Sequence, residues 1–155
     1  MAVARLERIA GEIRIREGAG SLIGHLKTRG LRLGVISTGL TLLVDRVARE
    51  LDITDCVANH LKTAAGKVTG EVDIRVVHGR KDRQVEAFCR RHALGRREVI
   101  TVGDSEGDVS MFRGTGLSIA FHPADTAVES AADRICRGGP LTELIPLIDV
   151  QESRI

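Results

Sequence analysis

The chain has 155 residues with a formal net charge of +2, and 43% of its residues are hydrophobic, so we expect one globular domain, residues 1–150, with a short polar tail, 151–155. The low, evenly mixed charge and an aromatic content of only 2% exclude the basic patches and stacking platforms of nucleic-acid-binding proteins. No apolar run approaches the ~18 residues that a membrane span needs, and the N-terminus lacks a secretory core, so the sequence predicts a cytoplasmic protein.

Short β-branched runs alternate with amphipathic helices along the chain, a pattern typical of a parallel sheet with helices on both faces. Around residues 64–67 two extended pieces instead flank a turn, which predicts a small β-hairpin excursion. We therefore expect an α/β fold, a Rossmann-like three-layer αβα domain with a mostly parallel sheet. In chain order, the expected helices cover residues 2–9, 19–29, 40–51, 80–92, 106–112, 126–132 and 141–148, and the expected extended segments cover 12–16, 31–36, 56–72, 99–103 and 117–120.

Two carboxylates follow the strand 99–103, and they are the strongest chemical signal in the chain. Asp104 comes directly after this strand, and Asp108 lies about one turn into the next helix, so both face the C-terminal edge of the sheet. Mg²⁺ prefers hard oxygen ligands and takes only one or two protein carboxylates, which predicts a magnesium site for phosphate chemistry. The alternative is that Asp104 caps the helix and Asp108 is a solvated acid of its first turn.

A second predicted strand ends in Ser37, Thr38 and Gly39, ahead of the helix over residues 40–51. Backbone N–H groups at a helix N-terminus, with a hydroxyl beside them, form a site suited to phosphate. An ordinary helix cap with a tight turn is the alternative. In a parallel sheet, this strand end and Asp104 would face one crevice.

Lys81 lies at the predicted start of the helix 80–92, where the helix dipole disfavours a cation. A bound phosphate would offset that cost, whereas a solvated surface lysine is the ordinary alternative. His78 lies just upstream without an evident partner. The cysteines and the other histidines show no metal-ligand spacing, and we interpret them as reduced thiols and as structural or surface residues: Cys56, Cys89, Cys136, His25, His60, His92 and His122.

Taken in order, these segments resemble the phosphoserine phosphatase-like branch of the haloacid dehalogenase superfamily, over residues 14–148. Residues 30–39 resemble the second motif of that family. The resemblance implies that Ser37 binds the phosphoryl group, with help from the backbone of Thr38 and Gly39.

The third and fourth motifs of the family are matched by Lys81 and by residues 103–108. The resemblance implies a catalytic and phosphate-binding role for Lys81, which would stabilise the charge of the phosphoryl group and of the nucleophile. It implies that Asp104 is the direct Mg²⁺ ligand and that Asp108, in the same metal site, orients water and Lys81.

The first motif of the family, Asp-x-Asp-x-Thr/Val on a central N-terminal strand, occurs nowhere in this sequence. Its first Asp is the nucleophile in the family and its second is the general acid and base, so the resemblance implies a chain that lacks both groups and most of the cap. Gly107 also stands where relatives usually have Asn. A missing central strand would remove roughly 10 kcal/mol of apolar burial and leave two strand edges unpaired.

Four explanations fit this absence: the flanking strands close up, residues 12–16 fill the gap, a second chain supplies the strand, or the chain is an N-terminally truncated form of a longer enzyme, which we favour. We expect the core of a Mg²⁺-dependent phosphomonoester hydrolase for a small phosphorylated metabolite, phosphoserine first among them, that is inactive by itself. The alternatives are a non-catalytic phosphate-binding or regulatory domain, and a receiver-like signalling domain, whose early acidic cluster the sequence lacks.

Overall fold

The computed structural model describes residues 1–152, and in this part of the chain the strands form two three-stranded sheets. In the first sheet β1 runs parallel to β2, and β2 pairs antiparallel with β3 as the predicted hairpin. In the second sheet β4, β5 and β6 are parallel. The strands are β1 (Gly34–Leu40), β2 (Asp55–Ala64), β3 (Lys67–Asp73), β4 (Ile100–Gly103), β5 (Leu117–Phe121) and β6 (Arg134–Cys136).

The helices lie within one to three residues of their predicted bounds at most ends. The predicted helices 106–112 and 141–148 each begin with a 3-10 turn, and α7 is described as far as Glu152, so the rest of the predicted tail, 153–155, lies outside the described residues. The helices are α1 (Val3–Glu12), α2 (Ala19–Thr28), α3 (Thr41–Leu51), α4 (Asp82–His92), α5 (Val109–Phe112), α6 (Thr126–Ala131) and α7 (Leu144–Glu152), with 3-10 turns η1 (Arg96–Glu98), η2 (Glu106–Asp108) and η3 (Leu141–Glu143).

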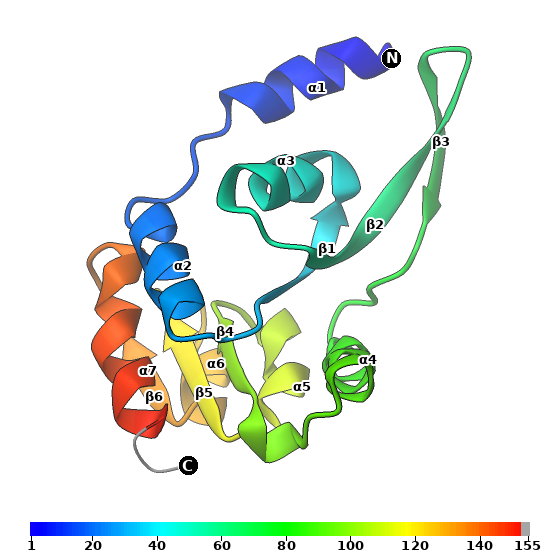
Figure 1. The fold of residues 1–155 in the computed structure, drawn as a ribbon. Helices are drawn as coiled ribbons and strands as arrows, with labels where there is room; N and C mark the ends of the chain where they lie inside the picture. The colour runs from blue at the N-terminus through cyan, green and yellow to red at the C-terminus, as the bar shows by residue number, and fades with distance from the viewer. Residues whose placement is uncertain (153–155) are drawn as a thin grey trace.

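β5 is buried at every position, and its two faces pack against different helices because successive strand residues point to opposite sides. Leu117, Ile119 and Phe121 belong to a cluster with α2 and α7. Ala120 belongs to a second cluster with α4, α5 and α6. Figure 1 shows α2 and α7 on one side of β4 and β5, and α4 and α5 on the other. The predicted three-layer αβα fold is confirmed.

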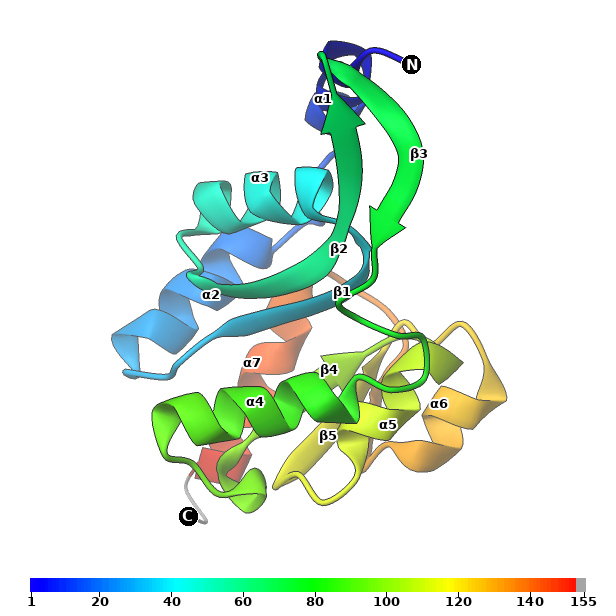
Figure 2. The same ribbon diagram turned by 90° about the vertical axis from the view of Figure 1, so that its right-hand side faces the viewer.

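The strands do not form one continuous sheet. Within residues 1–152, β1 pairs only with β2, and β4 pairs only with β5, and Figure 2 shows no strand between β1 and β4. The flanking strands have therefore not closed up. The extended piece predicted over residues 12–16 forms no strand, so it does not fill the gap either. Val102 of β4, in the middle of the fold, is 36% exposed.

The hairpin and α1 form a lobe at one end of the molecule (Figure 2). Ala2 makes an isolated antiparallel bridge with Lys67 of β3, and the Arg46 guanidinium on α3 donates to the carbonyls of Ala10 and Ile13, at 2.5 and 2.6 Å. These contacts join the start of α1 to β3 and its end to α3. None of the helices described in the structure combines the length and the apolar character needed to cross a bilayer.

Candidate active site

Lys81 and Asp108 form an ion pair at the start of α4. The distance from Lys81 Nζ to Asp108 Oδ1 is 2.5 Å, and the two side chains are 12% and 5% exposed. α4 begins at Asp82, so Lys81 is its N-cap residue. A cation is unfavourable for the helix dipole at this place, and the Asp108 carboxylate offsets that cost.

Asp108 also holds the turn that follows β4. Its Oδ2 accepts hydrogen bonds from the backbone N–H groups of Asp104, at 2.8 Å, and Ser105, at 3.2 Å. A Cβ at Gly103 would overlap with the Asp108 side chain, so this close approach needs glycine. Burial by itself favours the neutral acid, but the hydrogen bonds from Lys81 and from the two backbone groups hold the pKa of Asp108 below its usual value.

Asp104 presents an exposed carboxylate at the end of β4. Burial of part of this carboxyl raises its pKa, and the neighbouring charge of Asp108 raises it further. A divalent cation would relieve this repulsion between two acids, and a hard carboxylate oxygen is the ligand that Mg²⁺ prefers. The donor set therefore fits Mg²⁺ on Asp104, whereas both oxygens of Asp108 already accept hydrogen bonds from Lys81 and the turn.

Residues 37–39 lie inside β1, so the prediction that they form a helix N-terminus is wrong. β1 continues to Leu40, because its pairing with β2 extends to Asn59, with a shift of register after Ile36. α3 begins only at Thr41. Ser37 Oγ accepts a hydrogen bond from the Gly39 N–H at 3.0 Å. The hydroxyl and the glycine thus belong to an irregular strand end.

A buried asparagine, which the sequence analysis did not single out, ties this strand end to the segment before Lys81. Asn59 on β2 is 6% exposed. Its Nδ2 donates to the carbonyls of Thr38, at 2.9 Å, and Val76, at 3.2 Å. Its Oδ1 accepts from the backbone N–H groups of Arg75 and Val76, both at 2.8 Å. Because about half of the residues of β2 are polar, nothing in the local sequence singles out Asn59.

The predicted site residues come from three places that lie on one side of the molecule, at the right of Figure 2: the C-terminal end of β1, the first turn of α4 and the turn after β4. Hydrogen bonds join Lys81, Asp108 and the backbone of Asp104 directly. Ser37 belongs to the first sheet and bonds within its own strand. The structure therefore brings the lysine and the two acids together, whereas Ser37 lies in β1, a strand of the other sheet.

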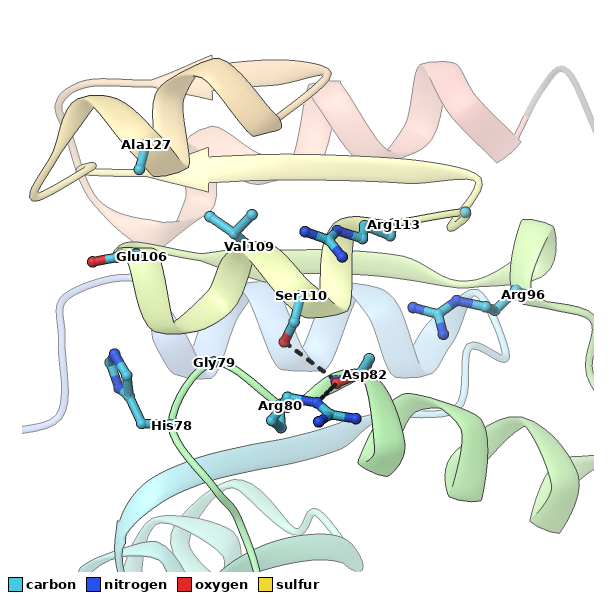
Figure 3. A pocket seen from close by; sticks show the side chains of 11 residues that line it. His78, Gly79, Arg80, Asp82, Arg96, Glu106, Val109, Ser110, Arg113 and Ala127 are labelled. Carbon is cyan, nitrogen blue, oxygen red and sulfur yellow. Dashed lines mark hydrogen bonds and ion pairs between the residues drawn. The ribbon is translucent and has the colours of Figure 1, made fainter.

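A cavity of about 650 Å³ lies beside this cluster, between the loop before α4 and the helix α5 (Figure 3). His78 and Glu106 line one end, and Arg96 lines the other. The side chains of Lys81 and Asp108 are not among its lining residues.

Four of the five histidines take part in structural contacts, as the sequence analysis expects. Each of the four has a hydrogen-bond partner elsewhere in the fold, and the three cysteines are free thiols. The pairs are His25 with Asp149, His60 with Thr41, His92 with Asp55, and His122 with Arg16 and the Gly139 carbonyl.

Comparison with known proteins identifies the family of this chain. Residues 1–113 match the family described as haloacid dehalogenase-like hydrolase. The chain is 34% identical to a phosphoserine phosphatase of Archaeoglobus fulgidus over 129 residues. This alignment covers 83% of this chain and 37% of that protein. It is also 30% identical to a phosphoserine phosphatase of Methanocaldococcus jannaschii over 147 residues. This alignment covers 94% of this chain and 69% of that protein.

A solved structure described as a phospho-aspartyl intermediate analogue of phosphoserine phosphatase has the same fold. The TM-score is 0.89 at 28% identity, and the match covers 95% of this chain and 70% of that one. The chain thus spans about a third of the Archaeoglobus protein and about two thirds of the other two proteins.

Proposed function

Because this chain belongs to the haloacid dehalogenase-like hydrolases, we propose that it is the core of a Mg²⁺-dependent phosphomonoester hydrolase of the phosphoserine phosphatase type. The observation that carries this proposal is the Lys81–Asp108 pair beside the exposed Asp104 at a strand end. The relatives named above are phosphoserine phosphatases, so phosphoserine, or another small phosphorylated metabolite, is the proposed substrate. The three free thiols fit a reducing compartment, and we propose the cytoplasm.

Each residue of the site has one role in this proposal. Asp104 holds Mg²⁺, which when bound neutralises charge on the phosphoryl oxygens. Lys81 binds the phosphoryl group, and Asp108 holds the Lys81 ammonium in position through their ion pair. The Ser37 hydroxyl and the backbone N–H groups of Thr38 and Gly39 bind further phosphoryl oxygens, and the Gly39 N–H exchanges its hydrogen bond to Ser37 Oγ for one to the phosphate.

We propose that the nucleophile comes from a segment outside these 155 residues. The solved relative is a phospho-aspartyl analogue, and the sequence contains no Asp-x-Asp. The separate sheets and the exposed Val102 support a missing parallel strand between β1 and β4. The segment belongs either to an upstream part of a longer polypeptide or to a second chain, and the 155-residue chain alone is inactive.

Substitution of Asp104 tests the metal site. Mg²⁺ should raise the melting temperature of the wild-type chain, because a ligand that binds only the native state stabilises it, and Asp104→Asn should abolish this response. The raised pKa of Asp104 means that the native state prefers the neutral acid, so ionisation destabilises the fold once the pH rises above the native pKa. Without Mg²⁺ at pH 7, Asp104→Asn should therefore be as stable as wild type or more stable, by less than about 1 kcal/mol after solvent screening.

The control for this experiment is Glu71→Gln, which removes an exposed carboxylate that pairs with Lys62 on the hairpin. This variant should respond to Mg²⁺ like the wild type. An Asp104→Asn protein with an unchanged Mg²⁺ response would remove Asp104 from the site.

A synthetic strand tests the proposal about the nucleophile. A peptide with four or five aliphatic residues followed by Asp-x-Asp-x-Thr should confer phosphoserine hydrolysis on the purified chain, and the same peptide with Asn at both Asp positions should not. Hydrolysis by the chain alone, lost in Asp104→Asn, would contradict the need for an added strand.

A non-catalytic domain that uses the same residues to bind phosphate is the second candidate, because both carboxyl oxygens of Asp108 and the Lys81 ammonium are organised without a nucleophile in the chain. Phosphate-dependent stabilisation, with no hydrolysis in the presence of the aspartate peptide, would favour this candidate.

A further inference from the structure

His78 lies directly over the backbone of Gly107, in the turn that carries Asp104 and Asp108. A Cβ built on Gly107 would come within 2.7 Å of His78 Cε1 and 2.9 Å of His78 Nδ1. The imidazole therefore fills the space that a side chain at position 107 would occupy. Gly107 is buried, and His78 itself remains exposed, so the ring covers the glycine with one edge and faces solvent with the rest.

The segment of His78 and Lys81 runs along this turn and makes two successive contacts with it. The ring of His78 contacts Gly107, and the ammonium of Lys81 contacts the next residue, Asp108. Gly79, with a φ of +70°, allows the chain to turn between them. The imidazole thus lies one residue along the turn from the ion pair. Figure 3 shows its ring directed toward the turn, at the end of the cavity that Glu106 lines.

The imidazole of His78 has no hydrogen-bond partner among the described residues, unlike the other four histidines. An imidazole offers one N–H donor when neutral and two when protonated. A phosphate ester held by Lys81 would bring its oxygens to this part of the turn. A histidine with unused donors, held over a glycine beside the ion pair, is thus suited to contact a bound phosphate.

We propose that His78 is a substrate-binding residue. Its imidazole occupies the space that a side chain at position 107 would fill, and from there it donates a hydrogen bond to an oxygen of the phosphate monoester. This inference rests on the proposed function, because it assumes that Lys81 binds phosphate. His78 and Gly107 act as a pair: the glycine leaves room for the ring, and the ring supplies the polar contact that glycine lacks.

Inorganic phosphate in the presence of Mg²⁺ is the probe, and calorimetry gives its dissociation constant. His78→Ala should raise this constant roughly tenfold, as expected for a lost hydrogen bond to a charged group, and His78→Gln should restore most of the affinity. The Cε1–H NMR signal of His78 should shift on titration with phosphate, with the same dissociation constant. His25→Ala, on α2 and paired with Asp149, is the matched control and should bind phosphate like the wild type.

Gly107→Ala displaces the ring without deleting it, and should weaken phosphate binding as His78→Ala does. The double variant should be no weaker than His78→Ala alone, because the ring is lost only once. Wild-type affinity in His78→Ala, with binding abolished in Lys81→Met, would overturn the role of His78 and leave the proposed function standing. An absence of phosphate binding by the wild-type chain would overturn both.

Discussion

Lys81 and Asp108 carry opposite charges into positions that are only 12% and 5% exposed. Burial of a complete ion pair contributes little net stability, since desolvation offsets the attraction, but removal of one partner leaves a buried charge without compensation. Asp108 keeps two backbone hydrogen bonds of its own, so the charge of the carboxylate is set by the turn and not by Lys81 alone. The same pair therefore stabilises the turn and fixes the position of the Lys81 ammonium.

Lys81→Met should lower the free energy of unfolding at pH 7 by about 3–5 kcal/mol, because Asp108 remains buried and unpaired. The pKa of Asp108 is lowered in the native state, so its stabilising effect is present above the unfolded-state value of about 3.9 and is lost as the pH falls through the native value. In Lys81→Met this acid-dependent loss should be smaller. Urea unfolding at pH 7 gives the first effect, and a series from pH 7 to below about pH 3 gives the second, because the loss begins near the unfolded-state pKa of about 3.9.

The double variant Lys81→Met/Asp108→Asn is the control for that prediction. It should regain part of the lost stability, because no unpaired charge is buried. If Lys81→Met is as stable as the wild type, water hydrates the Asp108 carboxylate in place of Lys81, and the prediction is wrong.

At the scale of elements, periodic apolar residues predicted most of the fold. Leu22 and Leu26 of α2 and Val85 and Cys89 of α4 are buried as their helical spacing predicts. The short strand β6 was missed, because Arg134, Ile135 and Cys136 give no alternating pattern and the pairing with β5 alone defines it.

The strand β1 shows how pairing overrides local sequence. Its apolar run ends at Ile36, and the small residues that follow suggest a turn into a helix. Instead, hydrogen bonding to β2 continues to Asn59, whose side chain also fixes the Thr38 carbonyl. A side chain that bonds two other segments, distant in the chain, has no signature in a single local window.

Asn59→Ala should destabilise the fold by at least about 2 kcal/mol, because it leaves the buried N–H and C=O groups of Val76 without partners. Chemical denaturation measures this loss. The affinity for phosphate should also fall, since the segment that leads to Lys81 is no longer fixed to β1. Asn59→Asp keeps the acceptor for the N–H groups of Arg75 and Val76, so it should reduce the phosphate affinity less than Asn59→Ala does. An equal loss of affinity in both variants would contradict this account.

At the scale of the whole molecule, α4 packs against the second sheet and also contacts the first sheet. Asp55, at the start of β2, accepts hydrogen bonds from His92, at 2.9 Å, and from Arg91 at the end of α4. The ring of Phe88 on α4 also packs closely over Gly34 of β1, since a Cβ built on Gly34 would lie 3.1 Å from it. Because α4 also packs against Ala120 of β5, it holds the two sheets in place, and within residues 1–152 no strand of one sheet pairs with a strand of the other.

Asp55→Asn should lower the free energy of unfolding at pH 7 by about 1.5–3 kcal/mol, because charged hydrogen bonds to His92 and Arg91 are lost. Burial raises the pKa of Asp55, but the bonds from Arg91 and His92 outweigh it and leave the pKa below its usual value. The stabilisation is therefore present above about pH 3.9 and is lost as the pH falls further. The difference between variant and wild type should shrink from pH 6 to pH 3 in urea unfolding, and a constant difference would contradict the assignment to this carboxylate.

The sequence by itself determined the helices, most of the strands, the three layers and the residue types of the candidate site, because periodicity and strand-end motifs are local properties. Tertiary structure alone decided that Asn59 fixes the approach to Lys81 and that His78 covers Gly107. The ion pair of Lys81 with Asp108 followed from the resemblance only as an expectation, and the tertiary structure gave its geometry and burial. It also decided that β1 and β4 belong to separate sheets. Each of these depends on segments distant in the chain coming into contact, and a contact of that kind is set by packing and hydrogen bonding between elements, which no single stretch of sequence encodes.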